Sequence, residues 1–351
     1  MSADGAVATR GNEAAGGPAA GGDTPVGVPP PRRRRSAWEL FWGGVLSRRR
    51  RFWAGRARRL PAPVLSVGNL HLGGSGKTPL VAAVARHLRD RGTAVTILSR
   101  GYGRDTRGVL IASRGRGAEA SAAEVGDEPF MLAEQLQGVG IVVGEDRVEA
   151  GRHALQVLAP RPEVFVLDDG FSHLELARDL DLLAFPAHRP WGNGRLVPFG
   201  SLREPLGAAR AADAVLLTGV EGAAADAGRE LAERLRPFGF TGPGFAVGLE
   251  AALHPDVDGR VLLVTGVASP ERVLATARAL GLDVAQHLSF GDHHRFGRRS
   301  LERIERARAR TGAEAVVVTA KDRAKLEGRL DAPIRELRVE ATPEPAFWVW
   351  L

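Results

Sequence analysis

Short apolar runs alternate with amphipathic stretches along most of this chain. Apolar-rich runs are typical of strands buried on both faces, and they occur at residues 64–67, 93–98, 141–143, 164–167, 181–185 and 214–218. Residues 79–90, after the first run, place Leu80, Val81, Val84 and Leu88 on one helical face. Because strands that alternate with helices pair mostly in parallel, the pattern predicts an α/β fold with a mostly parallel sheet covered on both faces.

The alternation starts again after about residue 220. Here the pattern predicts strands at residues 261–264 and 315–319, and helices at residues 270–280 and 300–311. A chain of 351 residues is long enough for two cores. We therefore expect a second, smaller α/β domain in this part of the chain.

The N-terminal region has a different pattern. Residues 1–31 are mostly Ala, Gly and Pro, which predicts disorder, and four arginines follow at residues 32–35. Residues 37–46 then combine apolar and aromatic side chains, including Trp38 and Trp42, and more arginines follow. This stretch is about half of the roughly 20 residues that a bilayer span requires, and its arginines and aromatic rings favour an amphipathic helix on an anionic membrane surface. The alternatives are a solvated basic arm and a helix packed against the protein itself.

Charge is concentrated in the same N-terminal region. The formal net charge of the chain is +7, and residues 1–59 hold 12 Lys and Arg against 4 Asp and Glu. The rest of the chain is therefore close to neutral, which argues against a nucleic-acid-binding body. There is no cysteine, so disulfides and thiolate metal sites are excluded. Arginine supplies every side-chain cation except Lys77, Lys321 and Lys325, so a lysine here indicates a position that needs a compact ammonium group.

A glycine-rich loop lies between the first predicted strand and the first predicted helix. Residues 73–78 read Gly-Gly-Ser-Gly-Lys-Thr, a pattern in which backbone N–H groups surround the phosphates of a nucleotide. Lys77 supplies a cation for the outer phosphates, and the Thr78 hydroxyl can ligate Mg²⁺. The standard pattern has a glycine where this chain has His71, so the loop is a variant. The residues that we expect to bind ATP in this loop are Gly73, Gly74, Ser75, Gly76, Lys77 and Thr78.

A pair of acids follows the predicted strand at residues 164–167. Asp168 and Asp169 at a buried strand end would repel each other unless a cation lay between them. A carboxylate at the tip of an apolar strand is the usual Mg²⁺ ligand of nucleotide-binding folds. The pair therefore predicts a metal site, with an ordinary acidic turn as the alternative.

Further polar clusters are less specific. Asp127 lies at a predicted helix start and is either a catalytic base or a charge at the helix N-terminus. Tyr102 is the one tyrosine of the chain and lies between two glycines after a strand. Other loops with polar residues that could face a substrate are 192–194, 202–205 and 292–294.

Taken together, these runs resemble the tetraacyldisaccharide 4′-kinases of lipid A biosynthesis. The resemblance covers about residues 36–326, and the matching runs occur in this order: PVLSVGNLHLGGSGKTP, SRGYGR, VGDEP, GEDR, LDDGFSHLELARDLD, GNGRLVPFGSLREPL, GDHHRF and TAKDRAKL. It implies ATP-dependent phosphorylation of the 4′-hydroxyl of a tetraacyldisaccharide 1-phosphate to give lipid IVA. The implied cofactors are ATP and Mg²⁺, and the implied location is the cytoplasmic face of the bacterial inner membrane, as a peripheral protein. The partners would be the acylated disaccharide lipid and the anionic membrane surface, without nucleic acid or an obligate protein partner.

The resemblance also assigns roles to residues. It makes Lys77 and Thr78 ligands of the phosphates and Mg²⁺, and Asp168 and Asp169 the acidic pair on the metal side. Asp127 matches a catalytic base, His293 its partner from the second domain, Arg203 and Glu204 polar residues of the cleft, and Tyr102 a residue near the nucleotide. Pro186 and Ala320 depart from the family's acidic residues at their positions, and the long N-terminal extension is atypical.

The domain organisation follows from these assignments. We expect a disordered basic tail at residues 1–35, an amphipathic membrane-surface helix at 36–59, and a P-loop kinase domain at 60–220. Residues 221–351 would form the smaller α/β domain that completes the active-site cleft. The rival functions are a membrane-associated partitioning or targeting ATPase and a basic-tailed nucleic-acid-dependent ATPase; the loops at 192–205 and 292–294 favour the kinase over both.

Overall fold

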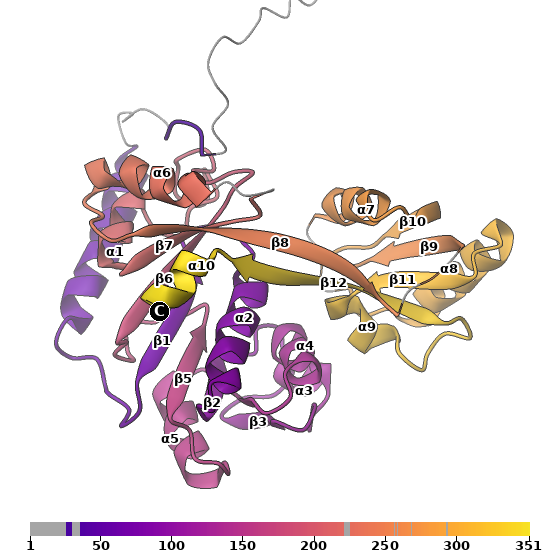
Figure 1. Ribbon diagram of the computed structural model, residues 1–351, viewed down its shortest axis with the longest axis horizontal. Helices are drawn as coiled ribbons and strands as arrows, with labels where there is room; N and C mark the ends of the chain where they lie inside the picture. The colour runs from indigo at the N-terminus through magenta and orange to yellow at the C-terminus, as the bar shows by residue number, and fades with distance from the viewer. Residues whose placement is uncertain are drawn as a thin grey trace, which may run out of the picture.

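Within the described residues, twelve strands form one continuous sheet. The structure, a computed structural model, describes residues 26–29, 36–220, 225–255, 257, 259–267, 269–292 and 294–351. The strands are β1 (Val64–Asn69), β2 (Val95–Ser99), β3 (Leu110–Arg114), β4 (Gly140–Val143), β5 (Val164–Asp168), β6 (Leu180–Pro186), β7 (Ala214–Thr218), β8 (Gly244–His254), β9 (Arg260–Thr265), β10 (Asp283–Ser289), β11 (Ala315–Thr319) and β12 (Ile334–Pro343). Their order across the sheet is β10-β9-β11-β12-β8-β7-β6-β1-β5-β2-β4-β3, so the sheet runs from one end of the molecule to the other (Figure 1).

Most neighbouring strands are parallel. The antiparallel pairs are β3 with β4 at one edge and β12 with β8 inside the sheet. Because β1 lies between β5 and β6 in parallel, the ends of these three strands meet at one edge of the sheet. The predicted mostly parallel α/β fold is confirmed.

Helices cover both faces of the first half of the sheet. One face carries α2 (Lys77–Asp90), α3 (Ala122–Val125), α4 (Asp127–Gln135) and α10 (Pro345–Trp350), and the other carries α5 (Arg147–Val157), α6 (Ala225–Leu235) and the 3₁₀ turns η1 (Leu206–Ala211) and η2 (Arg236–Phe238). In β5, Val166 packs into the core around α2, whereas Phe165 and Leu167 pack into the core around α5. Successive strand residues point to opposite faces, and both faces are covered here, which explains the continuous apolar run.

A smaller lobe forms the second half in the same way. It carries α7 (Pro270–Ala279) on one face and α8 (Arg298–Thr311) and α9 (Ala320–Leu326) on the other (Figure 1). In β9, Leu262 and Val264 pack into the α8 core, and Val261 and Leu263 pack into the α7 core. The predicted restart of the α/β pattern is therefore present.

The long antiparallel strands β8 and β12 join the two halves. The start of β8 contributes Phe245 and Val247 to the core around α2, and the end of β12 contributes Ala341 to the same core. The chain then ends in α10, where the Trp348 ring stacks on His87 of α2 with ring centroids 3.9 Å apart. Through these contacts the C-terminal residues pack against the first half of the molecule. The division of the chain into domains after residue 220 stays a prediction.

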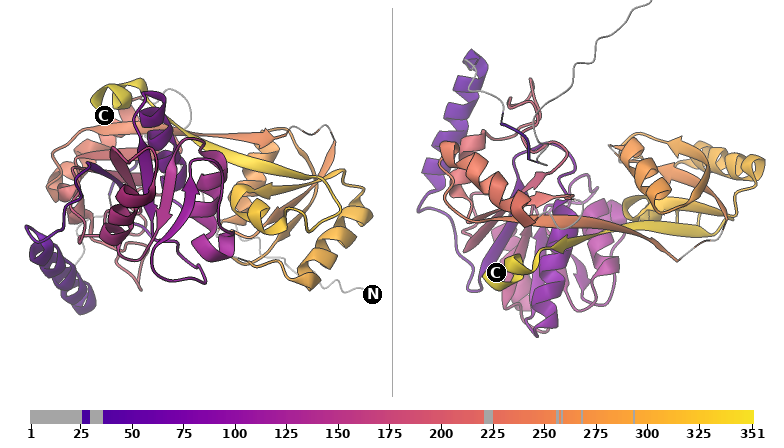
Figure 2. Two further views of the ribbon diagram at one scale, coloured as in Figure 1. Left: turned by 90° about the horizontal axis from the view of Figure 1, so that it is seen from below. Right: turned by 45° about the horizontal axis from the view of Figure 1, so that its top comes forward.

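Helix α1 (Ala37–Trp53) lies along the outside of the first half, on the side away from the smaller lobe (Figure 2). Ser36 and Glu39 form a reciprocal capping box at its start. Trp38, Leu40, Phe41, Val45 and Phe52 are exposed on it. No helix in the described part of the chain is long and apolar enough to cross a membrane.

Most of the predicted disordered tail, residues 1–35, lies outside the described residues. Residues 26–29 are described, and Val26 is buried there. Its carbonyl oxygen accepts a hydrogen bond of 2.8 Å from Trp191 Nε1.

Candidate active site

The glycine-rich loop connects β1 to α2 and has a fixed backbone shape. Gly76 precedes α2 in the left-handed conformation, with φ 71°, and a Cβ at this position would lie 3.1 Å from Thr218 Cβ. The Thr218 hydroxyl donates a hydrogen bond of 2.7 Å to the Ser75 carbonyl oxygen. Glycine is therefore required at residue 76, because a side chain would be strained and would also meet the residue that holds the loop.

Two buried side chains, Asn69 and His71, come just before the loop in the chain. Asn69, the last residue of β1, donates a hydrogen bond of 2.7 Å from Nδ2 to the Ser75 hydroxyl. His71 is buried edge-on against Phe185, and burial lowers the pKa of His71 to about 4, with smaller contributions from nearby cations. The position that departs from the standard glycine pattern thus holds a buried, neutral imidazole that packs against Phe185.

The acidic pair lies at the end of β5, beside the loop. Asp168 is buried, and its Oδ2 accepts a hydrogen bond of 3.1 Å from the Ser99 hydroxyl at the end of β2. Its Oδ1 has no hydrogen-bond partner among the described residues. Burial, with Glu128 and Asp169 nearby, raises the pKa of Asp168 to about 7, although Lys77 opposes the shift.

Asp169 has the opposite electrostatic environment. Arg203 Nη1 and Nη2 donate two hydrogen bonds to its carboxylate, at 2.8 and 2.7 Å, and Lys77 Nζ lies 3.6 Å from Oδ1. Burial raises the pKa of Asp169, but the hydrogen bonds from Arg203 and the charge of Lys77 outweigh it and hold the pKa at about 2. The pKa values of the two neighbouring carboxyl groups are therefore shifted in opposite directions.

The residues around Asp168 suit a divalent cation. A buried carboxylate oxygen without a partner, on a group whose charged form is disfavoured, is a site that a cation would stabilise. Within the described ranges, no three His, Asp or Glu side chains converge as a complete metal site. A cation here would need further oxygens from the Thr78 hydroxyl, nucleotide phosphates and water, which is how Mg²⁺ is normally bound.

Helix α9 of the smaller lobe contacts α4 through two ion pairs. Lys325 Nζ lies 2.6 Å from Asp127 Oδ2, and both side chains are mostly buried. One turn away, Lys321 pairs with Glu128. Together with the Lys77–Asp169 pair, these contacts place all three lysines of the chain against carboxylates around the predicted site.

Arg203 and Glu204 point in different directions. Arg203 also contacts the Asn69 side chain, so it links the acidic pair to the base of the loop. Glu204 instead pairs with Arg50 of α1 at 2.7 Å and accepts a hydrogen bond of 2.6 Å from the Ser172 hydroxyl. The structure thus brings Arg203 into the site and directs Glu204 towards the outer helix.

Of the two remaining predicted site residues, Tyr102 is described by the structure and His293 is not. Tyr102 is exposed in the loop after β2, between Gly101 and Gly103, which both have positive φ. His293 lies outside the described residues. Its neighbour His294 stacks on Phe290 and shares a hydrogen bond of 2.8 Å with the Ser300 hydroxyl.

Sequence reasoning missed several residues of this site. Ser99 and Asn69 are polar residues at the ends of buried strands, which is the signal that could have identified them. Arg147 is buried at the start of α5, where its charge acts on Asp168 and Asp169, and burial, together with Arg100, lowers the pKa of Arg147. It belongs to the GEDR run, to which no role was assigned.

Pro186 and Ala320, the two positions where this chain departs from the acidic residues of the family, lie beside the site. Pro186 ends β6 and pairs in register with Thr218, the residue that holds the loop. Ala320 is the first residue of α9, directly after the cap Thr319. Neither residue has a side chain that could replace a missing carboxylate.

Comparisons with known proteins identify the relatives of this chain. A family model described as "Tetraacyldisaccharide-1-P 4'-kinase" matches residues 37–351. The tetraacyldisaccharide 4'-kinase of Geobacter sulfurreducens is 42% identical over 284 residues, which cover 78% of this chain and 77% of the relative. That of Anaeromyxobacter dehalogenans is 42% identical over 305 residues, 81% of this chain and 79% of the relative.

A solved structure is similar along almost the whole chain. The crystal structure of LpxK from Aquifex aeolicus in complex with ATP superposes with a TM-score of 0.72 and 32% sequence identity. The match covers 89% of this chain and 95% of that chain.

Proposed function

The chain belongs to the tetraacyldisaccharide-1-phosphate 4'-kinase family, and from this premise we infer that its site transfers the γ-phosphoryl group of ATP to the 4′-hydroxyl of a tetraacyldisaccharide 1-phosphate, giving lipid IVA. The observation that carries the inference is the convergence of the glycine-rich loop, Lys77 and the Asp168–Asp169 pair at the carboxyl edge of one parallel sheet. Phosphoryl transfer needs this combination, because most of its catalysis is positioning and charge stabilisation.

The donor side of the reaction is formed by the loop and the acids. We propose that the backbone N–H groups of Gly73 to Gly76 surround the phosphates and that Lys77 stabilises charge on the transferred group. Mg²⁺ bound by Asp168 and Thr78 would supply charge neutralisation at the phosphate oxygens. Asp169 would hold Lys77 and Arg203 in place, since it contacts both side chains.

The acceptor side is formed between the two halves. We propose that Asp127, with His293, takes the proton from the 4′-hydroxyl, because a sugar hydroxyl is a weak nucleophile. Lys325 restricts the Asp127 carboxylate to one position through the 2.6 Å contact. Residues 221–351 would then complete the cleft and exclude water from it. Tyr102 would contact the nucleotide from its exposed loop, and Glu204 would hold α1 against the site.

The lipid acceptor requires access from a membrane. Helix α1 exposes Trp38, Leu40, Phe41 and Phe52 and carries a run of arginines at its end. Exposed aromatic rings beside arginines suit the interface of an anionic bilayer. We propose that α1 rests on the cytoplasmic face of the bacterial inner membrane and delivers the acylated disaccharide to the loop, without crossing the bilayer.

A transfer assay tests the function. Purified full-length protein is incubated with ATP labelled at the γ-phosphate, Mg²⁺ and tetraacyldisaccharide 1-phosphate, with Lys77→Ala as the inactive control. We expect label to move to the lipid. Hydrolysis of ATP at the same rate with and without the lipid, and no labelled lipid, would show a nucleotide switch instead of a kinase.

A membrane assay tests the location. Full-length protein and a double variant, Phe41→Ser with Phe52→Ser, are floated with vesicles that contain phosphatidylglycerol. These side chains are exposed, so the variant should fold normally. We expect the variant to remain in the soluble fraction, and equal flotation of the two proteins would contradict the role of α1.

A further inference from the structure

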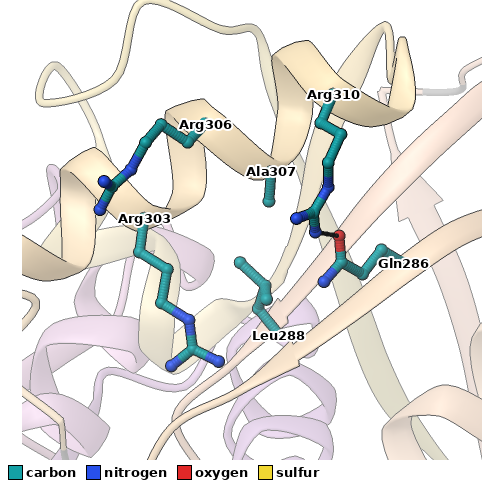
Figure 3. Close-up of a pocket in the computed structure, with 6 residues that line it drawn as sticks. All are labelled: Gln286, Leu288, Arg303, Arg306, Ala307 and Arg310. Carbon is teal, nitrogen blue, oxygen red and sulfur yellow. Dashed lines mark hydrogen bonds between the residues drawn. The ribbon is translucent and has the colours of Figure 1, made fainter.

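A second basic site lies in the smaller lobe, on the face of α8 next to the edge strand β10. A cavity of about 390 Å³ opens there, and its lining residues are Gln286, Leu288, Arg303, Arg306, Ala307 and Arg310 (Figure 3). Leu288 and Ala307 form an apolar floor, the guanidinium groups of Arg303 and Arg310 lie on either side of it, and Arg306 at the rim runs back along α8 (Figure 3). We call this cavity the α8 groove.

The carboxylates of α8 do not neutralise the groove. Glu302 pairs with Arg298 at 2.9 Å, and Glu305 pairs with Arg308 at 3.2 Å. Among the described residues, Arg303, Arg306 and Arg310 have no carboxylate within ion-pair distance. The acids of the helix thus pair with arginines outside the groove and leave three positive charges inside it.

Neutral groups orient each of these arginines instead. The Arg303 guanidinium lies over the Phe290 ring, 5.2 Å from its centroid. Arg306 Nε donates to the Glu302 carbonyl oxygen at 3.1 Å, and Arg310 Nη2 donates to Gln286 Oε1 at 2.9 Å. A guanidinium has five N–H donors, so most donors of the three groups remain available.

This arrangement favours one chemical class of ligand. Like charges on neighbouring positions of a helix repel one another, and here the helix is held in place by buried Ile304 and Ala307. Arginine forks bind the oxygens of phosphate groups in a bidentate manner, and an anion between them would remove the repulsion. An apolar floor would suit a carbon skeleton attached to the phosphate.

We propose that the α8 groove binds a phosphate ester, separately from the nucleotide loop. Its ligand is an anionic phosphate group joined to an apolar or sugar moiety, either as a free ester or as a phospholipid head group. The proposal does not depend on the kinase reaction, because none of the groove residues belongs to the site around Lys77.

Two probes distinguish the sources of the phosphate. The measurements use the full chain in a Lys77→Ala background, which removes the cation of the nucleotide loop. The first probe is glycerol 3-phosphate at constant ionic strength, with the rise in melting temperature as the readout. The second is flotation with phosphatidylcholine vesicles that do or do not contain phosphatidylglycerol, with Phe41→Ser and Phe52→Ser added to the background so that α1 does not mask the groove.

The test variant is Arg303→Gln with Arg306→Gln and Arg310→Gln. Arg299→Gln is the matched control, because it removes a charge from the same helix outside the groove. We expect the triple variant to bind at least one probe on the order of 25-fold more weakly than the control, since it loses two more arginines and each arginine near an anionic surface is worth about fivefold in affinity. Loss with glycerol 3-phosphate identifies a free ester, and loss with vesicles alone identifies a lipid head group.

One result overturns the proposal. If the triple variant matches Arg299→Gln with both probes, the arginines are a solvated helix face. Should the triple variant fold poorly, Arg306→Gln alone gives the same comparison, because its side chain is exposed. A fold-change indistinguishable from that of Arg299→Gln would again exclude the groove as a site.

Discussion

The ammonium group of Lys325 in α9 lies 2.6 Å from the Asp127 carboxylate at the start of α4. This ion pair connects the smaller lobe to the residue that we propose as the catalytic base. It therefore ties the chemistry of the acceptor hydroxyl to the contact between the two halves.

Lys325→Met should lower kcat by roughly 10- to 100-fold and leave the KM for ATP nearly unchanged. The substitution keeps the apolar stem but removes the cation, so the Asp127 carboxylate would no longer be held in one position. Steady-state kinetics with the lipid acceptor measure the effect. The matched control is Lys321→Met, which breaks the neighbouring pair with Glu128. If both variants lose kcat equally, the lysines only hold the lobes together, and Asp127 is not positioned by Lys325.

Asp168 should make the nucleotide-free protein less stable as pH rises. Its pKa is raised to about 7, so folding favours the protonated form. The stability that this proton contributes is complete below about pH 4 and is lost as pH rises through about 7. Between about pH 5 and pH 8 we expect the Asp168 contribution to the free energy of unfolding, taken as wild type minus Asp168→Asn, to fall by on the order of 2 kcal/mol. Buried His71 and His173, whose pKa values are lowered to about 4, contribute in the opposite direction in both proteins, so their effect cancels in this difference. Denaturant unfolding of both proteins measures the difference.

Asp169→Asn is the control for this pH effect. The pKa of Asp169 is lowered to about 2, so its contribution to stability is present above about pH 4 and is lost only as pH falls through about 2. Asp169→Asn should leave most of the change between about pH 5 and pH 8 in place, because burial, the largest cause of the raised pKa of Asp168, remains. An equal loss of pH dependence in both variants would contradict the assignment to Asp168.

Gly76→Ala should weaken ATP binding at least tenfold and destabilise the protein by about 1–2 kcal/mol. The new Cβ would adopt a left-handed backbone conformation and meet the Thr218 side chain. Gly74→Ala is the control, because Gly74 does not have a positive φ and a Cβ there meets no atom within 4 Å. Nucleotide titration and thermal unfolding measure the two effects, and equal behaviour of the two variants would rule out a special role of Gly76.

Arg50→Met should destabilise the protein by about 3 kcal/mol, because it leaves the buried Glu204 carboxylate without its partner. Arg59→Met breaks an exposed pair with Asp179, so it should change stability by less than about 1 kcal/mol. Urea unfolding of both variants gives the comparison. A small effect of Arg50→Met would mean that α1 is held mainly by its apolar contacts.

The parallel strands β1, β2, β4, β5, β6 and β7 could be predicted because they are covered on both faces, whereas the antiparallel edge strand β3 was missed. The run at residues 214–218 is β7 to the residue, and the run at 164–167 differs from β5 only by Asp168. Strand β12 gave no such signal, since it carries Arg335, Arg338 and two acids, Glu336 and Glu340. A strand that links two cores has no continuous apolar face along its length, so hydrophobic periodicity does not reveal it.

The site could be predicted only where its residues are close together in sequence. The loop at residues 73–78 and the pair Asp168–Asp169 were found in this way. The contact of Lys325 with Asp127 depends on the packing of α9 against α4, which no local pattern encodes. Arg203 and Glu204 were grouped because they are neighbours, but their side chains reach different partners: Arg203 reaches Asp169 of the acidic pair, and Glu204 reaches Arg50 of α1.

The placement of the three lysines also determines how fast reagents that modify lysine amines react with this protein. Lys77, Lys321 and Lys325 each contact a carboxylate around the candidate site, and none has a freely exposed side chain. Acylating reagents directed at lysine amines would therefore modify this protein slowly, and each modified lysine would report on the site. ATP should slow labelling of Lys77, while labelling of Lys321 and Lys325 would measure how often α9 and α4 separate. Lysine acylation, which on most proteins marks the outer surface, would here monitor the catalytic centre itself.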